Sequence, residues 1–417
     1  MPIQFKIHKL GALKNTTFEY KPFMIFSGDS GLGKSYAAFL SYFFVNSMMG
    51  EAALVSFIEE VLGKNASEIN QLNQYNITIS AQQYKKWLNK NASRFIGYLI
   101  GNEGLEAEVE IDVNFPNFTI GYKLVEDTGE KDIITYLNGN EGSPYKKTRP
   151  NINLLAIISQ GYLSESLLNI GYQRNMLLPP ARAALMGASI SATNAIMSIG
   201  MYKEFVEVLD LVLSASYNET LCPPYLLDAI SDILKGNLVR QDGRLYYEFN
   251  GTKLPISAAA SSIKELSPLF LLLQRYRAAE LSVLIEEPEA HLHPRMQIKV
   301  ADLIAHAVND GASFQVTTHS DYFMGRINDL LKLHYIKSNV SAEDYNALCN
   351  QNGLDGELTL NPDKLGAYYF KRREDGSVEI ITQEPSKGIP FDTFSDVVQQ
   401  TTTVSFALDD FIEEHNL

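Results

Sequence analysis

The sequence is poor in the residues that mark a secreted, metal-clustered or membrane-spanning protein. Its 417 residues include only 2 cysteines, Cys222 and Cys349, which supply neither a disulfide framework nor a metal cluster. No apolar run approaches the ~20 residues that a membrane-spanning helix needs, and the strongest candidate, 36–49, contains polar Ser41 and Asn46. The chain begins with no basic-then-apolar leader. These scarcities predict a cytoplasmic protein with reduced thiols and no membrane segment.

Cations are also scarce relative to acids. Lys and Arg number 35 against 49 Asp and Glu, which gives a net charge of −14. A chain this acidic is not expected to coat nucleic acid with its whole surface. The densest basic cluster, 145–149, favours a solvated loop over a nucleic-acid patch because a few cations specify little. Nucleic-acid binding in a local groove stays open.

What the chain does contain is an ordinary globular composition. Hydrophobic residues make up 45% and charged residues 20% of the sequence, enough for a sizeable core. The length is comfortable for two or three domains.

The most informative segment is a glycine-rich turn between an apolar run, 23–27, and an apolar helix pattern that starts near Tyr36. Its pattern, G-x-x-x-x-G-K-S, predicts a phosphate-binding loop whose backbone amides surround a polyphosphate. Lys34 would add a cation for the outer phosphates of ATP, and Ser35 a hydroxyl for Mg²⁺. The predicted loop consists of Gly28, Asp29, Ser30, Gly31, Leu32, Gly33, Lys34 and Ser35.

Two further predicted strands end in polar side chains. The apolar run 281–285 leads into Glu286 and Glu287, and the run 313–318 leads into His319. Ligands of α/β sheets bind at the carboxyl ends of the strands. We therefore expect Glu286 to hold Mg²⁺, Glu287 to orient the attacking water, and His319 to contact the γ-phosphate.

Other polar residues allow more than one interpretation. Arg182, after two prolines, is either an exposed arginine at a strand end or a guanidinium that faces a phosphate or a partner subunit. Gln160 is a candidate for a glutamine that senses the nucleotide. His291 and His293 favour a turn over a zinc pair, because no third ligand is evident.

The remaining patterns suggest how the chain is organised. Alternating residues over 106–140 predict an antiparallel β arm, and 191–235 predicts a helical insertion. Both fall within an expected ATPase domain, 1–323. Residues 324–417 predict a small C-terminal α/β extension that ends in an acidic helix.

Three motifs together resemble the ABC-type ATPases of the overcoming-lysogenization-defect, SMC and RecF group. These are the phosphate loop 28–35, the string Glu-Glu-Pro-Glu-Ala-His-Leu-His-Pro at 286–294, and Thr-Thr-His-Ser at 317–320. The Leu-Pro-Pro-Ala-Arg string at 178–182 is also similar to that group. The resemblance implies a P-loop α/β fold with a mixed central sheet, Mg²⁺ on Ser35 and Glu286, and Glu287 as catalytic base.

The resemblance also implies a site shared between two copies of the chain. Ser261 and Ser262 stand where the family's signature motif reaches the γ-phosphate of a partner, which predicts a homo-oligomer of head-to-tail dimers. Two positions depart from the family pattern: Glu286 replaces the usual Asp, and Ser262 replaces a glycine. A Cβ at Ser262 obstructs a close approach, so we expect slow hydrolysis.

The absence of an Asp-x-Asp pair after Phe323 predicts that this chain has no nuclease activity of its own. The leading hypothesis is an ATPase subunit of a two-component phage-defence system, resembling PARIS-like or Septu-like systems. It would control a separately encoded effector, a nuclease or toxin, in response to a phage protein. The alternative is a RecF- or SMC-like repair ATPase that binds DNA with ATP. A transporter subunit is disfavoured by the degenerate signature.

Overall fold

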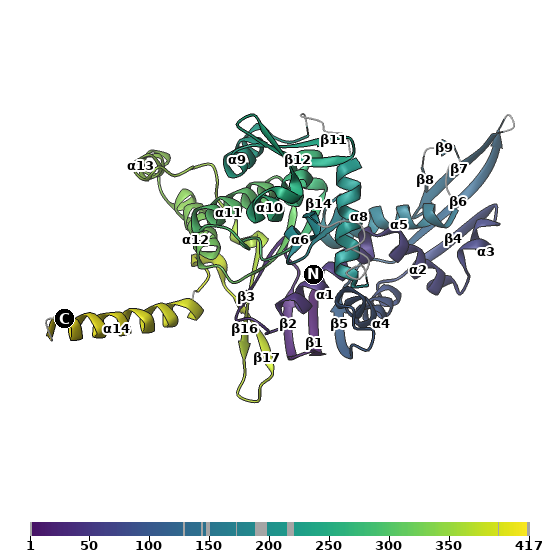
Figure 1. The fold of residues 1–417 in the computed structure, drawn as a ribbon. Coiled ribbons are helices and arrows are strands. Elements are labelled where there is room, and N and C mark those ends of the chain that lie inside the picture. Colours follow the sequence, from purple (N-terminus) through teal and green to yellow (C-terminus); the bar gives the residue numbers. More distant parts are fainter. Residues whose placement is uncertain are drawn as a thin grey trace.

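The computed structural model describes residues 2–127, 130–142, 145–146, 151–171, 173–187, 198–214, 221–390 and 392–414. Parts of the expected basic cluster (147–149), β arm (128–129) and helical insertion (191–197 and 215–220) therefore lie outside the described residues. The described chain forms a mixed α/β fold around one large sheet (Figure 1).

The central sheet has nine strands in the order β10-β14-β15-β3-β16-β17-β2-β1-β5 within the described residues. Parallel pairing joins β10, β14, β15, β3 and β16, and the strands near the other edge pair mainly antiparallel. The strands are β1 (Gln4–Leu10), β2 (Leu13–Glu19), β3 (Phe23–Gly28), β5 (Ala107–Asp112), β10 (Arg174–Leu178), β14 (Leu281–Glu286), β15 (Ser313–Thr318), β16 (Leu365–Arg372) and β17 (Val378–Gln383).

Both faces of the parallel half are buried, which explains the continuous apolar runs in its strands. Every residue of β14 and β15 is buried. Successive side chains point to opposite faces, so Leu284 joins one hydrophobic core while Val283 and Ile285 join the other. The first core lies under α1 (Lys34–Met49), and the second lies under α10 (Ser261–Arg275) and α11 (Pro294–Asn309).

The C-terminal strands belong to the central sheet. β16 pairs in parallel with β3, the strand that leads into the phosphate loop, and β17 follows beside it. The expected boundary near 323 therefore does not separate two sheets. Strand pairing between segments more than 300 residues apart leaves no trace in local composition, so the sequence patterns did not reveal it.

The expected β arm is present, with one correction. β6 (Phe118–Asp127) and β7 (Glu130–Leu137) pair antiparallel as predicted, together with β4 (Gln74–Ile79) and the short strands β8 (Asn140–Glu141) and β9 (Tyr145–Lys146). The first expected strand of the arm, β5, instead pairs with β1 at the edge of the central sheet. The alternating apolar and polar residues of β5 correctly predict a half-buried strand, but they do not indicate which strand it pairs with.

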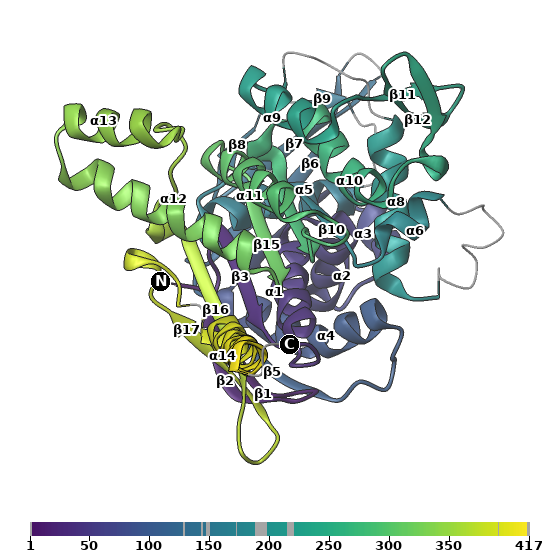
Figure 2. The same cartoon turned by 60° about the vertical axis from the view of Figure 1, so that its left-hand side comes forward.

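Helices surround these sheets (Figure 2). α5 packs on β6 of the arm, α2 and α3 pack on α5, and α4 packs on α1 and β5. The described part of the expected helical insertion contains α8 and α9, followed by a small sheet. The bounds are α2 (Glu51–Leu62), α3 (Ala66–Asn70), α4 (Ala81–Ile100), α5 (Asn151–Leu168), α6 (Arg182–Gly187), α8 (Gly200–Ser214), α9 (Pro224–Leu234), β11 (Asn237–Gln241), β12 (Arg244–Phe249) and β13 (Thr252–Pro255).

Three helices complete the C-terminal part. α12 (Asp321–Asn339) and α13 (Ala342–Asn352) follow β15, and α14 (Asp392–Glu414) extends away from the body (Figure 1). No single described helix is long and apolar enough to cross a membrane. Taken together, α1 and α2 meet that test by length and composition, but they are bent by 75° relative to each other.

Candidate nucleotide site

The phosphate loop connects β3 to α1, as its sequence predicts. Gly28 has a φ of 128°, and Gly33, the last residue before α1, has a φ of 90°. Side chains rarely tolerate this backbone region. A Cβ at Gly28 would also lie 2.6 Å from the carbonyl oxygen of Phe370 on β16. Glycine is therefore required both by the turn and by the neighbouring C-terminal strand.

Lys34 begins α1 and lies inside the curve of this loop. Its ammonium donates hydrogen bonds to the carbonyl oxygens of Gly28 (2.9 Å) and Asp29 (2.7 Å). Burial lowers the pKa of Lys34 to about 8, although the carboxylates of Glu287 and Asp29 oppose this shift. The ammonium is thus a buried cation at the amino terminus of a helix, where phosphate oxygens bind favourably.

Ser35 and Glu286 form a contact between the two motifs. The Ser35 hydroxyl donates a hydrogen bond of 2.7 Å to Glu286 Oε2 at the end of β14. Burial raises the pKa of Glu286 to about 7, and the hydrogen bond from Ser35 opposes that rise. The other carboxylate oxygen, Oε1, is buried and has no hydrogen-bond partner among the described residues.

The Ser35–Glu286 pair fits Mg²⁺. Hydroxyl and carboxylate oxygens are the ligands that this ion prefers, and it usually keeps waters and substrate phosphates as further ligands. The unsatisfied Glu286 Oε1 offers the negative charge that such an ion would neutralise. Ser35 and Glu286 are the two residues expected to hold the metal.

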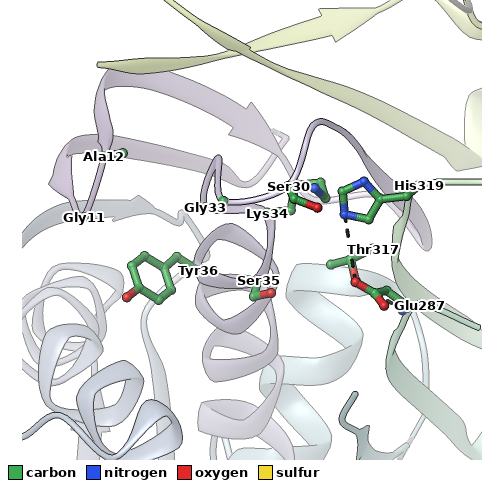
Figure 3. A pocket seen from close by; sticks show the side chains of 11 residues that line it. Gly11, Ala12, Ser30, Gly33, Lys34, Ser35, Tyr36, Glu287, Thr317 and His319 are labelled. Atoms are coloured by element: carbon green, nitrogen blue, oxygen red, sulfur yellow. Dashed lines mark hydrogen bonds and ion pairs between the residues drawn. The ribbon is translucent and has the colours of Figure 1, made fainter. Parts of the chain in front are cut away.

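Glu287 and His319 face each other across the same site (Figure 3). The distance from His319 Nε2 to Glu287 Oε1 is 3.9 Å. Burial and the nearby Lys34 cation lower the pKa of His319, which favours a neutral imidazole at pH 7. Glu287 has a φ of 47°, an uncommon conformation for a side-chain-bearing residue. This backbone turn separates its carboxylate from that of Glu286.

A cavity of about 450 Å³ lies between these groups. Most of the predicted residues contribute to it, together with a hairpin turn and an aromatic side chain that the sequence patterns did not indicate (Figure 3). Its lining consists of Gly11, Ala12, Ser30, Gly31, Gly33, Lys34, Ser35, Tyr36, Glu287, Thr317 and His319. Gly11 and Ala12 come from the β1–β2 turn, and only the tertiary fold brings that turn over the loop.

The other predicted site residues do not line the cavity. Gly28, Asp29 and Leu32 belong to the loop, but Leu32 is buried in the core. Ser261 and Ser262 form the start of α10, where Ser261 is exposed. Their expected role toward a second copy stays a prediction.

Arg182 corrects both interpretations of the sequence, because it is neither exposed nor directed at a phosphate. Its side chain is fully buried. The guanidinium donates to the carbonyl oxygens of Glu286 (2.7 Å) and Glu287 (3.3 Å), and Nε donates to the carbonyl oxygen of Glu265 (2.8 Å). The Glu265 carboxylate lies 3.2 Å from Nε. Arg182 thus holds the end of β14 and joins it to α10.

Gln160 is also corrected. Its side-chain amide donates to the carbonyl oxygen of Met49, at the end of α1 opposite Lys34. With a rise of about 1.5 Å per residue, these two ends of α1 are about 22 Å apart. Gln160 is therefore not part of the site. The local sequence predicted the helix that carries Gln160, α5, but it did not indicate which end of α1 this helix packs against.

Glu289 is a site residue to which the sequence patterns assigned no role. Its Oε1 accepts hydrogen bonds from the Thr318 hydroxyl and from the His319 backbone N–H, both at 2.7 Å. Burial raises the pKa of this carboxyl. The Glu-Glu-Pro-Glu string does contain a signal for this role. Glu289 is its third carboxylate, and the turn at the preceding proline brings it toward β15.

His291 and His293 take up other positions in the turn that leads into α11. His293 caps α11 through a hydrogen bond that its Nδ1 accepts from the Arg295 backbone N–H. Among the described residues no group of three or more His, Cys, Asp or Glu side chains could hold a metal ion.

One family model matches part of this chain. Residues 188–324 match the family described as AAA ATPase domain. This segment contains Glu286, Glu287 and His319 but not the phosphate loop. A search of curated proteins found no match.

Solved structures of SMC heads show a partial likeness. The SMC head bound to the C-winged helix domain of ScpA has a TM-score of 0.39 at 12% identity, over 93% of this chain and 98% of that chain. The SMC head domain from Thermotoga maritima gives 0.33 at 12%, over 92% and 100%. The head bound to the C-terminal domain of ScpA, derived from Pyrococcus furiosus, gives 0.38 at 11%, over 96% and 100%. At these scores nothing about partners follows.

Proposed function

We propose that this protein binds and hydrolyses ATP at a site completed by a second copy of the chain, and that it controls a separate effector in anti-phage defence. The observation that carries the ATPase part is the contact between Ser35 and Glu286, 251 positions apart in the chain. Lys34, Glu287 and His319 line the adjoining cavity. These are the groups that phosphoryl transfer to water requires.

Each group has a defined task in this proposal. Lys34 and the loop amides bind the phosphates, and bound Mg²⁺ would neutralise charge on their oxygens. Glu287 accepts a hydrogen bond from the attacking water and receives its proton. Neutral His319 donates its ring N–H to a γ-phosphate oxygen, and Glu289 holds the His319 backbone in place.

Glu287→Gln tests the proposed base. The variant keeps the size and the backbone contacts of the residue but cannot take a proton, so turnover should fall about 10²-fold or more while ATP still binds. The measurement is phosphate release alongside binding of a fluorescent ATP analogue. Lys34→Ala is the matched control and should lose binding itself. Unchanged turnover in Glu287→Gln would assign the base to another residue.

Complementation between two variants tests the shared site. Lys34→Ala disables the phosphate loop of its own copy, and Ser262→Arg blocks the surface predicted to meet the partner's nucleotide. Each variant alone should be inactive. A mixture forms some dimers with one intact site, so activity should reappear, up to about a quarter of the wild-type value for random pairing. A folded but inactive mixture would contradict a shared site.

The control of a separate effector rests on the sequence, which has no Asp-x-Asp pair after Phe323. Expression of the native operon, followed by purification of this chain, should recover a product of a neighbouring gene. Phage restriction by this chain alone would contradict the proposal. ATP-dependent duplex binding with a steep salt dependence would instead favour the RecF- or SMC-like alternative.

A further inference from the structure

The most exposed apolar surface of the described chain lies on α14. This helix of 23 residues extends away from the body (Figure 1). Every residue from 401 to 414 is exposed. The exposed fractions of Val404, Leu408 and Ile412 are 54%, 60% and 47%. The long helices α1, α10 and α11 bury most of their large apolar side chains instead.

The residues of α14 divide into two faces. Val404, Leu408 and Ile412 follow one another at intervals of four, so they share one face of the helix. We call these three residues the α14 stripe. Asp409, Asp410, Glu413 and Glu414 lie beside or behind this stripe. No lysine or arginine lies within α14 itself, so its charged side chains are all acidic.

Such a helix needs a surface to pack against. Isolated helices are marginally stable in water, and most of their stability in proteins comes from burial of an apolar face. A second copy is a poor candidate, because two α14 helices packed stripe to stripe would place acidic rims against each other. The chain's own net charge of −14 makes the rest of its surface an unfavourable partner as well.

We propose that α14 is a docking helix for a different protein, which offers an apolar groove with Lys and Arg along its rim. Amphipathic helices commonly bind in such grooves through anchors spaced by three or four residues. The groove would cover the α14 stripe, and its basic rim would pair with Asp409 and Glu414, which lie on either side of the stripe. The identity of the partner as the effector rests on the proposed function, whereas the docking surface does not.

The test uses the full chain co-expressed with the products of the genes that flank its own, one at a time. Val404→Asp/Leu408→Asp should weaken the complex at least a hundredfold, because it places charge in the apolar groove. Phe406→Asp is the matched control: it lies on the opposite face at 64% exposure, and the complex should persist. Asp409→Lys/Glu414→Lys should weaken binding most at low salt.

Several results would overturn the proposal. These are the absence of a complex with any flanking gene product, a complex that survives the stripe substitutions, stripe-dependent self-association by light scattering, or stripe-dependent binding to phosphatidylcholine vesicles. Measuring phosphate release separates a failure of the docking proposal from a failure of the proposed function. The docking proposal is wrong if variants of the α14 stripe keep the complex. The proposed ATPase activity is wrong if the wild-type protein releases no phosphate.

Discussion

Two clusters of lysines and carboxylates occupy opposite parts of the central sheet and behave in opposite ways. The edge cluster consists of Lys6 on β1, Lys85 on α4, and Glu110 and Asp112 on β5. Lys85 Nζ lies 2.6 Å from Glu110 and 2.8 Å from Asp112. Hydrogen bonds to Asp112 and Glu110 raise the pKa of Lys85, and its ammonium lowers the pKa of both carboxyls. Lys85 and the two carboxylates thus stabilise one another's charged forms.

The site cluster, Lys34 with Glu286, shows the reverse shifts. Burial lowers the pKa of Lys34 to about 8 and raises that of Glu286 to about 7. Desolvation therefore outweighs the attraction between opposite charges here. In the edge cluster the side chains are 30–44% exposed, so pairing prevails instead.

The difference explains what each cluster does. Exposed pairs keep their hydration and add little to stability, whereas the site cluster holds charges that the protein alone does not fully satisfy. Phosphate oxygens and Mg²⁺ would supply the missing partners of Lys34 and Glu286. An ionic group at the nucleotide site is thus costly for the fold and useful for binding.

The largest effect is expected at the most buried ion pair, Arg182–Glu265. Arg182→Met removes a fully buried guanidinium and leaves the Glu265 carboxylate without its cation. The free energy of unfolding should fall by about 3–5 kcal/mol, measured by urea denaturation.

Arg182→Met/Glu265→Met is the matched control, because it removes both charges and should recover a large part of that loss. A loss of less than about 1 kcal/mol in Arg182→Met, the size expected for the exposed edge cluster, would contradict the larger cost of unpairing a buried charge.

An intermediate effect is expected from Glu286 as the pH changes. Its folded pKa of about 7 exceeds the ordinary value of 4.5, so the folded protein binds this proton more tightly than the unfolded chain. The resulting stability is fully present below pH 4.5 and is lost as the pH rises through 7. Ligand-free protein should lose roughly 2–3 kcal/mol between pH 5 and 8 relative to Glu286→Gln.

The measurement is urea unfolding of both proteins at each pH in the absence of Mg²⁺ and nucleotide. Parallel pH profiles for the wild type and Glu286→Gln would show that this carboxyl is ionised throughout, like those of the edge cluster.

The smallest effect is expected in the edge cluster. Lys85→Met removes the cation that both Glu110 and Asp112 contact, but these side chains are partly hydrated. The cost should be about 1 kcal/mol or less, and it should shrink in 1 M salt. A loss comparable to that of Arg182→Met, unaffected by salt, would contradict the distinction between the clusters.

The nucleotide-binding motifs were predictable because their chemistry is local. Gly28 to Ser35 specify a turn, a cation and a hydroxyl within eight residues, and β14 presents Glu286 directly after an apolar run. The hydrophobic patterns also predicted these strands and α1. Their parallel pairing then places His319 at the same edge of the sheet.

Residues that act through distant contacts were not predictable in this way. Arg182 follows a proline pair that resembles an exposed strand end, and only the packing of α10 over β14 buries it. Glu289 lies within a recognised string, yet its role depends on Thr318 and His319 of the next strand.

The sequence by itself determined the chemistry of this protein: a phosphate loop, a pair of carboxylates and a histidine, each at a strand end. Short-range patterns encode these features because turns, charges and strand alternation need only adjacent residues. The tertiary structure alone decided that β16 supports the loop and that Arg182 holds Glu286 and Glu287. Pairing and burial depend on which distant segments meet, and burial turned ordinary charges into a binding site.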